Sequence, residues 1–200
     1  MNPTIAIVIL AAGKSSRLGQ PKQLLPFKGK SLLIHVVQIA KQVSENVFVI
    51  IGSDKKKMEA EIKNEAVDTV FNEAWEEGMA SSIRCGLLRA TEKIQDLGSV
   101  IFMVCDQPFV TTGLLQNLVQ EKERSGKAIV ASAYAEIAGT PVLFDKSVWP
   151  ELMELQGDIG ARKIIVKNKE RVATIDFPLG KVDMDTAEDY RKLLLQKDLI

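Results

Sequence analysis

The sequence IAIVILAAGKSSRLGQPKQLL, residues 5–25, decides how the chain folds. Its first part, Ile5 to Leu10, is an unbroken apolar run rich in Ile and Val, which is typical of a strand buried on both faces of a parallel sheet. Small, polar and cationic residues follow as far as Gly19. When a strand is followed by such a loop, the loop lies at the carboxyl edge of an open α/β sheet, where ligands bind. The stretch therefore predicts both the sheet and a ligand site.

The loop after this strand suits an anion. Small side chains let the backbone approach a ligand closely, and free N–H groups suit phosphate oxygens. Three cations in or just after the loop, Lys14, Arg17 and Lys22, are placed to neutralise a polyphosphate.

Two common phosphate loops are excluded. Gly13 and Gly19 are two glycines six residues apart, whereas a dinucleotide-binding fingerprint needs three. Gly29, Lys30 and Ser31 resemble the end of a P-loop, but its first glycine is replaced by a leucine. We therefore interpret Gly29 as a turn residue, with Lys30 or Ser31 near the start of a helix.

Helical and strand-like segments alternate along the chain. The expected helices cover residues 31–43, 55–64, 80–91 and 112–123, and the expected strands cover residues 5–10, 46–51, 68–71, 99–104 and 128–133. Five strands separated by crossover helices predict an α/β fold, a doubly wound and mostly parallel sheet flanked by helices. With 200 residues, of which 46% are hydrophobic, we expect a single domain over residues 1–200.

Composition narrows the class of protein. The 26 cationic and 26 anionic residues cancel, so nothing predicts binding to nucleic acid or to a membrane. The longest apolar runs are shorter than a membrane span, and no basic segment precedes the first one, so we expect a cytoplasmic protein. Two cysteines without a CxxC motif predict neither a zinc cluster nor a disulfide framework. A nucleophilic thiol would need His35 as its base, but His35 lies among apolar helical residues and is interpreted as a packing residue.

A single acid follows another buried strand. In VIFMVCDQPF, residues 100–109, Asp106 falls at the carboxyl end of the strand and Pro108 ends the ladder. A carboxylate at such an edge is costly unless it is paired, and Mg²⁺ bridging it to substrate phosphates is a fitting partner. The alternative is that Asp106 caps the helix that starts near Thr111.

Four further stretches have simple structural interpretations. Ser81 or Ser82 is suited to cap the helix that follows Gly78. The sequence Gly157-Asp158 is suited to end one helix and cap the next, and Pro141 to begin a strand after a turn at Gly139. Near the end, Asp185 or Thr186 is suited to cap a last helix with acids in its first turn.

The residues from Leu10 to Leu25 resemble the signature L-A-[AG]-G-x-S-x-R-M-G-x-x-K-x-L-L of the nucleotidyltransferases of the molybdenum cofactor guanylyl- and cytidylyltransferase family, with Leu18 in place of Met. The resemblance covers nearly the whole chain, in five motifs. It implies a nucleoside triphosphate on this loop, a nucleotide-binding half over about residues 1–110 and an acceptor-binding half over about 111–200. The nucleotide-binding residues that it implies are Leu10, Ala11, Ala12, Gly13, Lys14, Ser15, Arg17, Lys22, Gly78 and Ser82.

The family's motifs also imply a metal site. Asp106 matches its Asp-x-Pro aspartate, and the segment from residue 182 to 190 resembles its D-[IV]-D-T-P-E-D motif, with Ala187 in place of proline. The resemblance places Mg²⁺ on Asp106 and Asp185, with Asp183 either behind these direct ligands or as an alternative ligand. It implies catalytic roles for Arg17, Lys22 and Asp106.

Base choice rests on two details. The segment from Asn72 to Ile83 is similar to N-x-x-W-x-x-G-M-x-x-S-[LI] of the cytidylyltransferase branch, which implies that Gly78 and Ser82 lie against cytosine and ribose. Ala12 stands where the guanylyl branch usually has glycine, which favours CTP over GTP.

The acceptor side is implied by the family's G-x-P-V-L-F and G-D-x-G-A-R motifs, which assign Gly139, Pro141, Asp158 and Arg162 to the acceptor. The reaction that the resemblance implies moves CMP from CTP to the phosphate of molybdopterin or molybdenum cofactor and releases pyrophosphate, in the maturation of a molybdenum hydroxylase. Alternatives are another phosphorylated acceptor, such as a methylerythritol or sugar phosphate, the use of GTP, and a chaperone that carries molybdopterin to an apo-hydroxylase.

Overall fold

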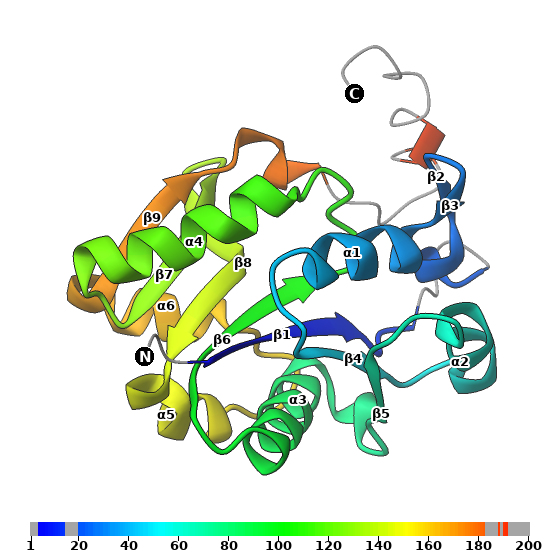
Figure 1. Ribbon diagram of the computed structural model, residues 1–200, viewed down its shortest axis with the longest axis horizontal. Helices are drawn as coiled ribbons and strands as arrows, with labels where there is room; N and C mark the ends of the chain where they lie inside the picture. Colours follow the sequence, from blue (N-terminus) through cyan, green and yellow to red (C-terminus); the bar gives the residue numbers. More distant parts are fainter. Residues whose placement is uncertain (1–3, 15–19, 183–187, 189, 192–200) are drawn as a thin grey trace.

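The computed structural model describes residues 4–14, 20–182, 188 and 190–191, which build a seven-stranded sheet between two layers of helices (Figure 1). The strands lie in the order β5-β4-β1-β6-β8-β7-β9. Their bounds are β1 Thr4–Ala11, β4 Val47–Ile51, β5 Asp68–Phe71, β6 Leu97–Val104, β7 Ile129–Tyr134, β8 Ile137–Asp145 and β9 Val172–Asp176. The helices are α1 Leu32–Lys41, α2 Lys55–Ile62, α3 Met79–Lys93, α4 Thr112–Ser125, α5 Trp149–Met153 and α6 Arg162–Lys167.

All strands but β8 run in one direction. The pairs β5·β4, β4·β1, β1·β6 and β7·β9 are parallel, whereas β8 lies antiparallel between β6 and β7. The register between β7 and β8 shifts next to Ala131, and Pro141 lies on β8 opposite this shift. Since proline cannot donate to a ladder, the irregularity is where β8 accommodates it. Our prediction that Pro141 begins the strand is therefore wrong.

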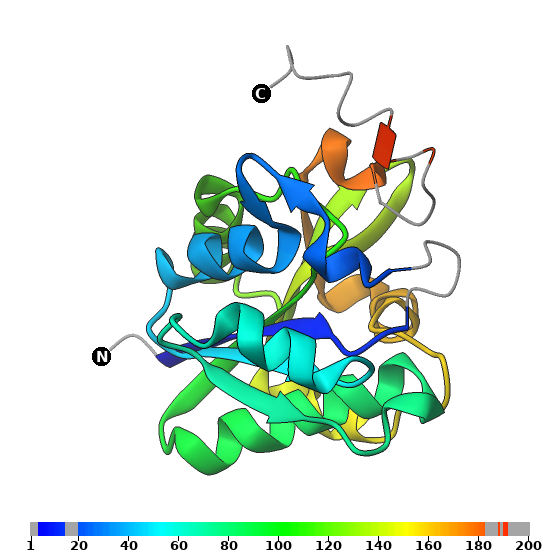
Figure 2. The ribbon, with the colours of Figure 1, turned by 90° about the vertical axis from the view of Figure 1, so that its right-hand side faces the viewer.

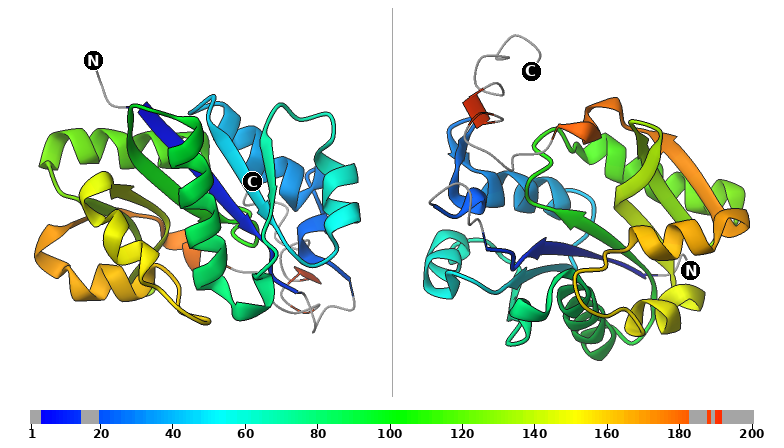
Figure 3. Two further views of the ribbon diagram at one scale, coloured as in Figure 1. Left: turned by 90° about the horizontal axis from the view of Figure 1, so that it is seen from below. Right: turned by 180° about the vertical axis from the view of Figure 1, so that it is seen from behind.

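The sheet separates two apolar cores, because successive residues of its strands point to opposite faces. On β1, Ile7 and Ile9 pack with α1, α2 and α4, whereas Ala6 and Val8 pack with α3, α5 and α6. Figure 2 shows α1 and α3 on opposite sides of β1, and Figure 3 shows α3 and α5 on the lower face. The unbroken apolar run at the start of the chain is thus an interior strand of the sheet, between β4 and β6, with both of its faces covered.

The predicted sheet and helices are confirmed. All five expected strands and all four expected helices are present, with ends that differ by at most two residues. Gly29 lies in the turn between two short strands, β2 Pro26–Phe27 and β3 Lys30–Ser31, and the hydroxyl of Ser31 caps α1 by accepting from Ile34 N at 3.2 Å. Within the described parts of the chain, every helix is too short or too polar to span a membrane.

Parallel order brings four strand ends together. The carboxyl ends of β1, β4, β5 and β6 meet at one edge of the sheet, at residues 11, 51, 71 and 104. The loop after β1, the glycine after β4, the helix start after β5 and the acid after β6 therefore surround one place.

Candidate active site

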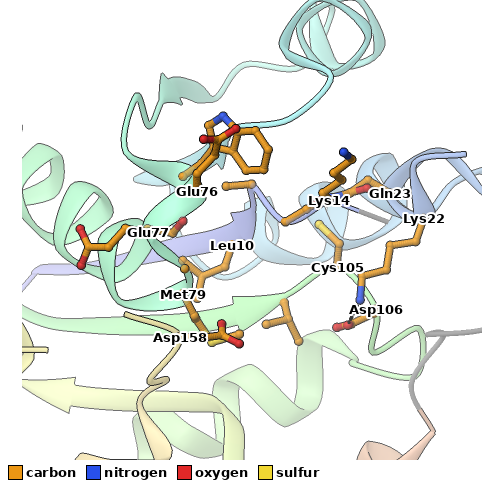
Figure 4. Close-up of a pocket in the computed structure, with 16 residues that line it drawn as sticks. Leu10, Lys14, Lys22, Gln23, Glu76, Glu77, Met79, Cys105, Asp106 and Asp158 are labelled. Carbon is orange, nitrogen blue, oxygen red and sulfur yellow. Dashed lines mark hydrogen bonds and ion pairs between the residues drawn. The ribbon is translucent and has the colours of Figure 1, made fainter. Parts of the chain in front are cut away.

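A cavity of about 480 Å³ opens at this edge of the sheet (Figure 4). This volume is in the range of sites for small ligands. Its walls come from the β1 loop, the start of α3, the end of β6 and the segment between α5 and α6. The lining residues are Leu10, Ala12, Gly13, Lys14, Lys22, Gln23, Trp75, Glu76, Glu77, Gly78, Met79, Ser82, Val104, Cys105, Asp106 and Asp158.

Lys22 and Asp106 form an ion pair in the wall of this cavity. Lys22 Nζ donates to Asp106 Oδ2 at 2.6 Å, and about a fifth of each side chain is exposed. Helix α4 is capped by Thr111, whose hydroxyl accepts from Leu114 N at 3.1 Å. The capping role considered for Asp106 is therefore wrong, and its carboxylate faces the cavity instead.

Gln23 holds the two ends of the loop together. Its side chain is 3% exposed, and Nε2 donates to the carbonyls of Ala11 and Gly13 at 2.9 and 3.0 Å. It lies in the short 3₁₀ helix Lys22–Leu24, directly after the lysine that pairs with Asp106. The buried amide thus fixes the position of Lys22 relative to the end of β1.

Trp75 packs closely against Gly52, the residue that follows β4, next to the backbone of Ala12. A Cβ atom at Gly52 would lie 2.6 Å from Trp75 Cβ and 2.7 Å from the carbonyl oxygen of Ala12. Only glycine allows so close an approach of the end of β4 to both neighbours. The contact closes the cavity between the β1 loop and the segment before α3.

Asn72 organises the start of α3. Its Nδ2 donates to the hydroxyls of Ser81 and Ser82 at 2.8 and 3.1 Å, and its Oδ1 accepts from Ala74 N at 3.1 Å. Ser81 in turn donates to Gly78 O at 2.8 Å. Gly78, and neither serine, occupies the N-cap position, so the predicted serine cap is wrong.

We call residues 155–160, between α5 and α6, the strap. Gly78 has a φ of +117° and faces the strap so closely that a Cβ would lie 2.7 Å from the Cα of Asp158. The strap carbonyl of Gly157 accepts from Ala80 N at 3.1 Å. Helix α5 ends at Met153 and α6 begins at Arg162, so the expected cap pair at Gly157-Asp158 is wrong and this dipeptide instead docks on α3.

The structure brings most of the predicted nucleotide residues together. Six of them with Lys22 line the cavity: Leu10, Ala12, Gly13, Lys14, Gly78 and Ser82. Ala11 is buried at the end of β1 and contributes its carbonyl to Gln23. Ser15, Arg17, Asp183 and Asp185 lie outside the described residues.

One of the four predicted acceptor residues lines the cavity, and the other three do not. Asp158 lines the cavity, whereas Gly139, Pro141 and Arg162 do not. Gly139 and Pro141 lie on β8. The hydroxyl of Thr140, between them, donates to Oε1 of Gln107 at 3.0 Å, and Gln107 directly follows Asp106 in sequence. Arg162 is the first residue of α6, which follows the strap in sequence.

Cys105 and His35 are not arranged as a nucleophile and its base. Burial, and then the neighbouring Asp106, raise the pKa of Cys105 far above its ordinary value, so the thiol stays protonated. His35 contacts Pro108 O through Nε2 at 3.0 Å and packs edge-on to Phe27. Its interpretation as a packing residue is confirmed.

The donor set fits a divalent metal held chiefly by its substrate. In the described ranges, no three His, Cys, Asp or Glu side chains gather as a metal cluster. Asp106 supplies a carboxylate to the cavity, beside cations suited to phosphate. Mg²⁺ takes few protein oxygens and completes its shell with phosphate and water, so one or two carboxylates suffice.

Sequence reasoning did not assign seven lining residues to the site: Gln23, Trp75, Glu76, Glu77, Met79, Val104 and Cys105. A polar residue in the apolar segment PKQLLPF was a signal for Gln23, because a buried amide needs backbone partners. Nothing in the sequence indicated that Glu77 would meet the strap, which lies 80 residues later.

Comparison with known proteins agrees with this geometry. The sequence of residues 7–172 matches the family model of the MobA-like NTP transferase domain. Nicotine blue oxidoreductase of Paenarthrobacter nicotinovorans is 28% identical, over 96% of this chain and 97% of its own length. Purine catabolism protein PucB of Bacillus subtilis is 25% identical, over 94% of this chain and 95% of its own.

Solved structures of similar proteins have the same fold. Rv0371c from Mycobacterium tuberculosis H37Rv superimposes with a TM-score of 0.82 at 30% identity, over 98% of this chain and 100% of that one. A complex of Rv0371c with manganese has a TM-score of 0.78 at 28% identity, over 96% of this chain and 98% of that one. The matched residues include most of β1, its loop, the start of α3 and Asp106, so the chain belongs to the MobA-like NTP transferase family.

Proposed function

We propose that the protein transfers CMP from CTP to the phosphate of molybdopterin or molybdenum cofactor and releases pyrophosphate. The observation that carries the proposal is the Lys22–Asp106 ion pair in the wall of the cavity at the carboxyl edge of the sheet. A cation and a carboxylate side by side are what a triphosphate and its metal require.

The triphosphate is assigned to the β1 loop. Lys14 and Lys22 line the cavity there, and the family resemblance adds Arg17. We expect Lys22 to stabilise charge on the transferring α-phosphate and Arg17 to hold the leaving pyrophosphate. In-line attack by the acceptor's phosphate needs no protein base, because a phosphate monoester is already ionised near neutral pH.

The metal is assigned to Asp106, with Asp185 as the second carboxylate. When bound, Mg²⁺ would offset charge on the phosphate oxygens and draw the two anions together. The manganese complex of Rv0371c supports a divalent ion in this family.

The base is assigned to the end of the cavity beside Ser82. The Ser82 hydroxyl accepts from Asn72, and among the described residues no acceptor takes its proton, so it is a donor suited to a pyrimidine carbonyl. Ala12 also lines the cavity, and it carries a methyl group where the guanylyl branch usually has glycine. Both features favour CTP over GTP, although a single methyl group discriminates by only about 1–3 kcal/mol.

Pyrophosphate release tests the proposal. Purified protein with Mg²⁺ and molybdopterin is given CTP, GTP, ATP or UTP in turn, and we expect release with CTP. Asp106→Asn should abolish release, while Glu92→Gln, an exposed change on α3 away from the cavity, should not.

The other outcomes separate the alternatives. Release with GTP would contradict the assignment of Ala12 and Ser82 but not the site. Release only with a methylerythritol or sugar phosphate would replace the acceptor. Binding of molybdopterin without any release would support the chaperone.

A further inference from the structure

Glu77 and Arg84 form a bridge between the start of α3 and the strap. Arg84 Nη2 lies 2.7 Å from Glu77 Oε2, and Glu77 Oε1 accepts from Gly157 N at 3.2 Å. Arg84 Nη1 also donates to the carbonyl of Leu155. Two charged side chains of the nucleotide half therefore hold two backbone groups of the strap.

The bridge is continuous with the cavity wall. Gly157 O accepts from Ala80 N, and the Gly78 backbone lies against Asp158. Asp158 lines the cavity, beside Met79 in Figure 4 and opposite Lys22 and Asp106. The position of the Asp158 carboxylate therefore depends on how the strap is held.

We propose that Glu77 and Arg84 are positioning residues for the acceptor, because they fix the strap and so fix Asp158 in the cavity wall. This inference rests on the proposed function. A fixed carboxylate is suited to accept hydrogen bonds from paired N–H donors on the edge of a flat heterocycle, and the amide and amino groups of a pterin form such a pair.

The ionisation of Glu77 supports the geometry. Hydrogen bonds from Arg84, and then from Gly157 N–H, hold the pKa of Glu77 below its ordinary value, so the carboxylate is charged near neutral pH. A charged acceptor strengthens both contacts of the bridge.

The first readout is hydrogen exchange of the strap amides in the protein alone. Glu77→Ala and Arg84→Met should each increase exchange at residues 155–160 about tenfold, because each removes a charge-assisted contact to the strap. Glu77→Gln keeps an oxygen for Gly157 and should have a smaller effect. Arg89→Gln is the matched control, since Arg89 lies on the same helix and pairs with Asp68 and Glu92.

The second readout separates the substrates. We expect the KM for molybdopterin to rise about tenfold in Glu77→Ala and Arg84→Met, with less than twofold change in the KM for CTP. The exchanged pair, Glu77→Arg with Arg84→Glu, should not restore the wild-type value. Arginine at position 77 cannot accept from Gly157 N–H, and glutamate at position 84 cannot donate to Leu155 O.

Four outcomes would overturn the inference: unchanged exchange in the strap, faster exchange with an unchanged KM for molybdopterin, equal rises in both KM values, or restoration of the wild-type KM by the exchanged pair. Restoration by the exchanged pair would show an ion pair that only stabilises α3. Absence of transfer by the wild-type protein would instead overturn the proposed function and with it the role of Asp158. The exchange data would still report whether Glu77 and Arg84 hold the strap.

Discussion

Lys22 Nζ lies 2.6 Å from Asp106 Oδ2, which joins the return of the β1 loop to the acid after β6, 84 residues further along the chain. The pair places a cation for phosphate and a carboxylate for a metal in contact with the same cavity. The following predictions test this arrangement and the backbone around it.

Asp106→Asn should reduce turnover at saturating CTP by at least about a hundredfold, because it removes the charge that faces the metal and Lys22. The same variant should change the free energy of unfolding by no more than about 1 kcal/mol, since the pair is partly exposed. Initial rates and denaturant unfolding measure the two effects. A large loss of stability would mean that Asp106 supports the fold. Glu121→Gln, which breaks the ion pair of Glu121 with Arg124 on α4, serves as control.

Gln23→Met should destabilise the protein by about 1–3 kcal/mol, because the carbonyls of Ala11 and Gly13 lose their buried donor. It should also weaken CTP binding, measured by calorimetry, because the loop is no longer held at both ends. Gln38→Met is the control, since Gln38 joins Lys30 and Glu65 away from the cavity. Equal CTP affinity in both variants would contradict the role of Gln23.

Gly78→Ala should cost about 2–4 kcal/mol of stability. The residue has a φ of +117°, and its new methyl group would meet the strap backbone at Asp158. Gly126→Ala provides the comparison at a φ of +63° with open space around the Cβ, where we expect about 1 kcal/mol. Thermal and denaturant unfolding of the two variants should therefore differ; similar losses would mean that the strap moves aside freely.

His35 should make stability fall as the pH is lowered below neutrality. Burial, opposed by the contact with Pro108, lowers its pKa below the ordinary value of 6.5. The unfolded chain then binds more protons around pH 6.5, so stability is full above this pH and is lost as the pH falls through the folded pKa. Since His35 is the single histidine in the sequence, His35→Gln should flatten the free energy of unfolding between pH 7.5 and 5.5. An unchanged slope would contradict this assignment.

The strands and helices around β1 were predictable because their apolar patterns are strong and local. The antiparallel course of β8 was not, since strand direction depends on the connections rather than on periodicity. β9 escaped prediction for another reason: it is exposed or half-buried along its length and lacks a clear apolar run. Helices α5 and α6 have only five and six residues, too few for a periodic signal.

In the site too, features with a local sequence signal were predictable, and features that depend on contacts between distant segments were not. Residues next to a strand end, such as Lys14 and Asp106, were predictable because the topology sends all those ends to one edge. The docking of the strap on Gly78 was not predictable, because Gly157-Asp158 carries an ordinary cap signal, and only the family resemblance assigned Asp158 to the acceptor. Contacts such as Glu77 with Gly157 join distant segments and have no local signature.

The central claim is that the cavity directs attack on the α-phosphate of CTP. The most direct test uses CTP labelled with phosphorus-32 at the α-position, together with Mg²⁺ and molybdopterin, followed by separation of the products. We predict that the label moves to the molybdopterin product, that unlabelled pyrophosphate is released, and that Asp106→Asn leaves the label in CTP. Label that stays in CTP with the wild-type protein, or appears only as free CMP, would contradict the proposed transfer.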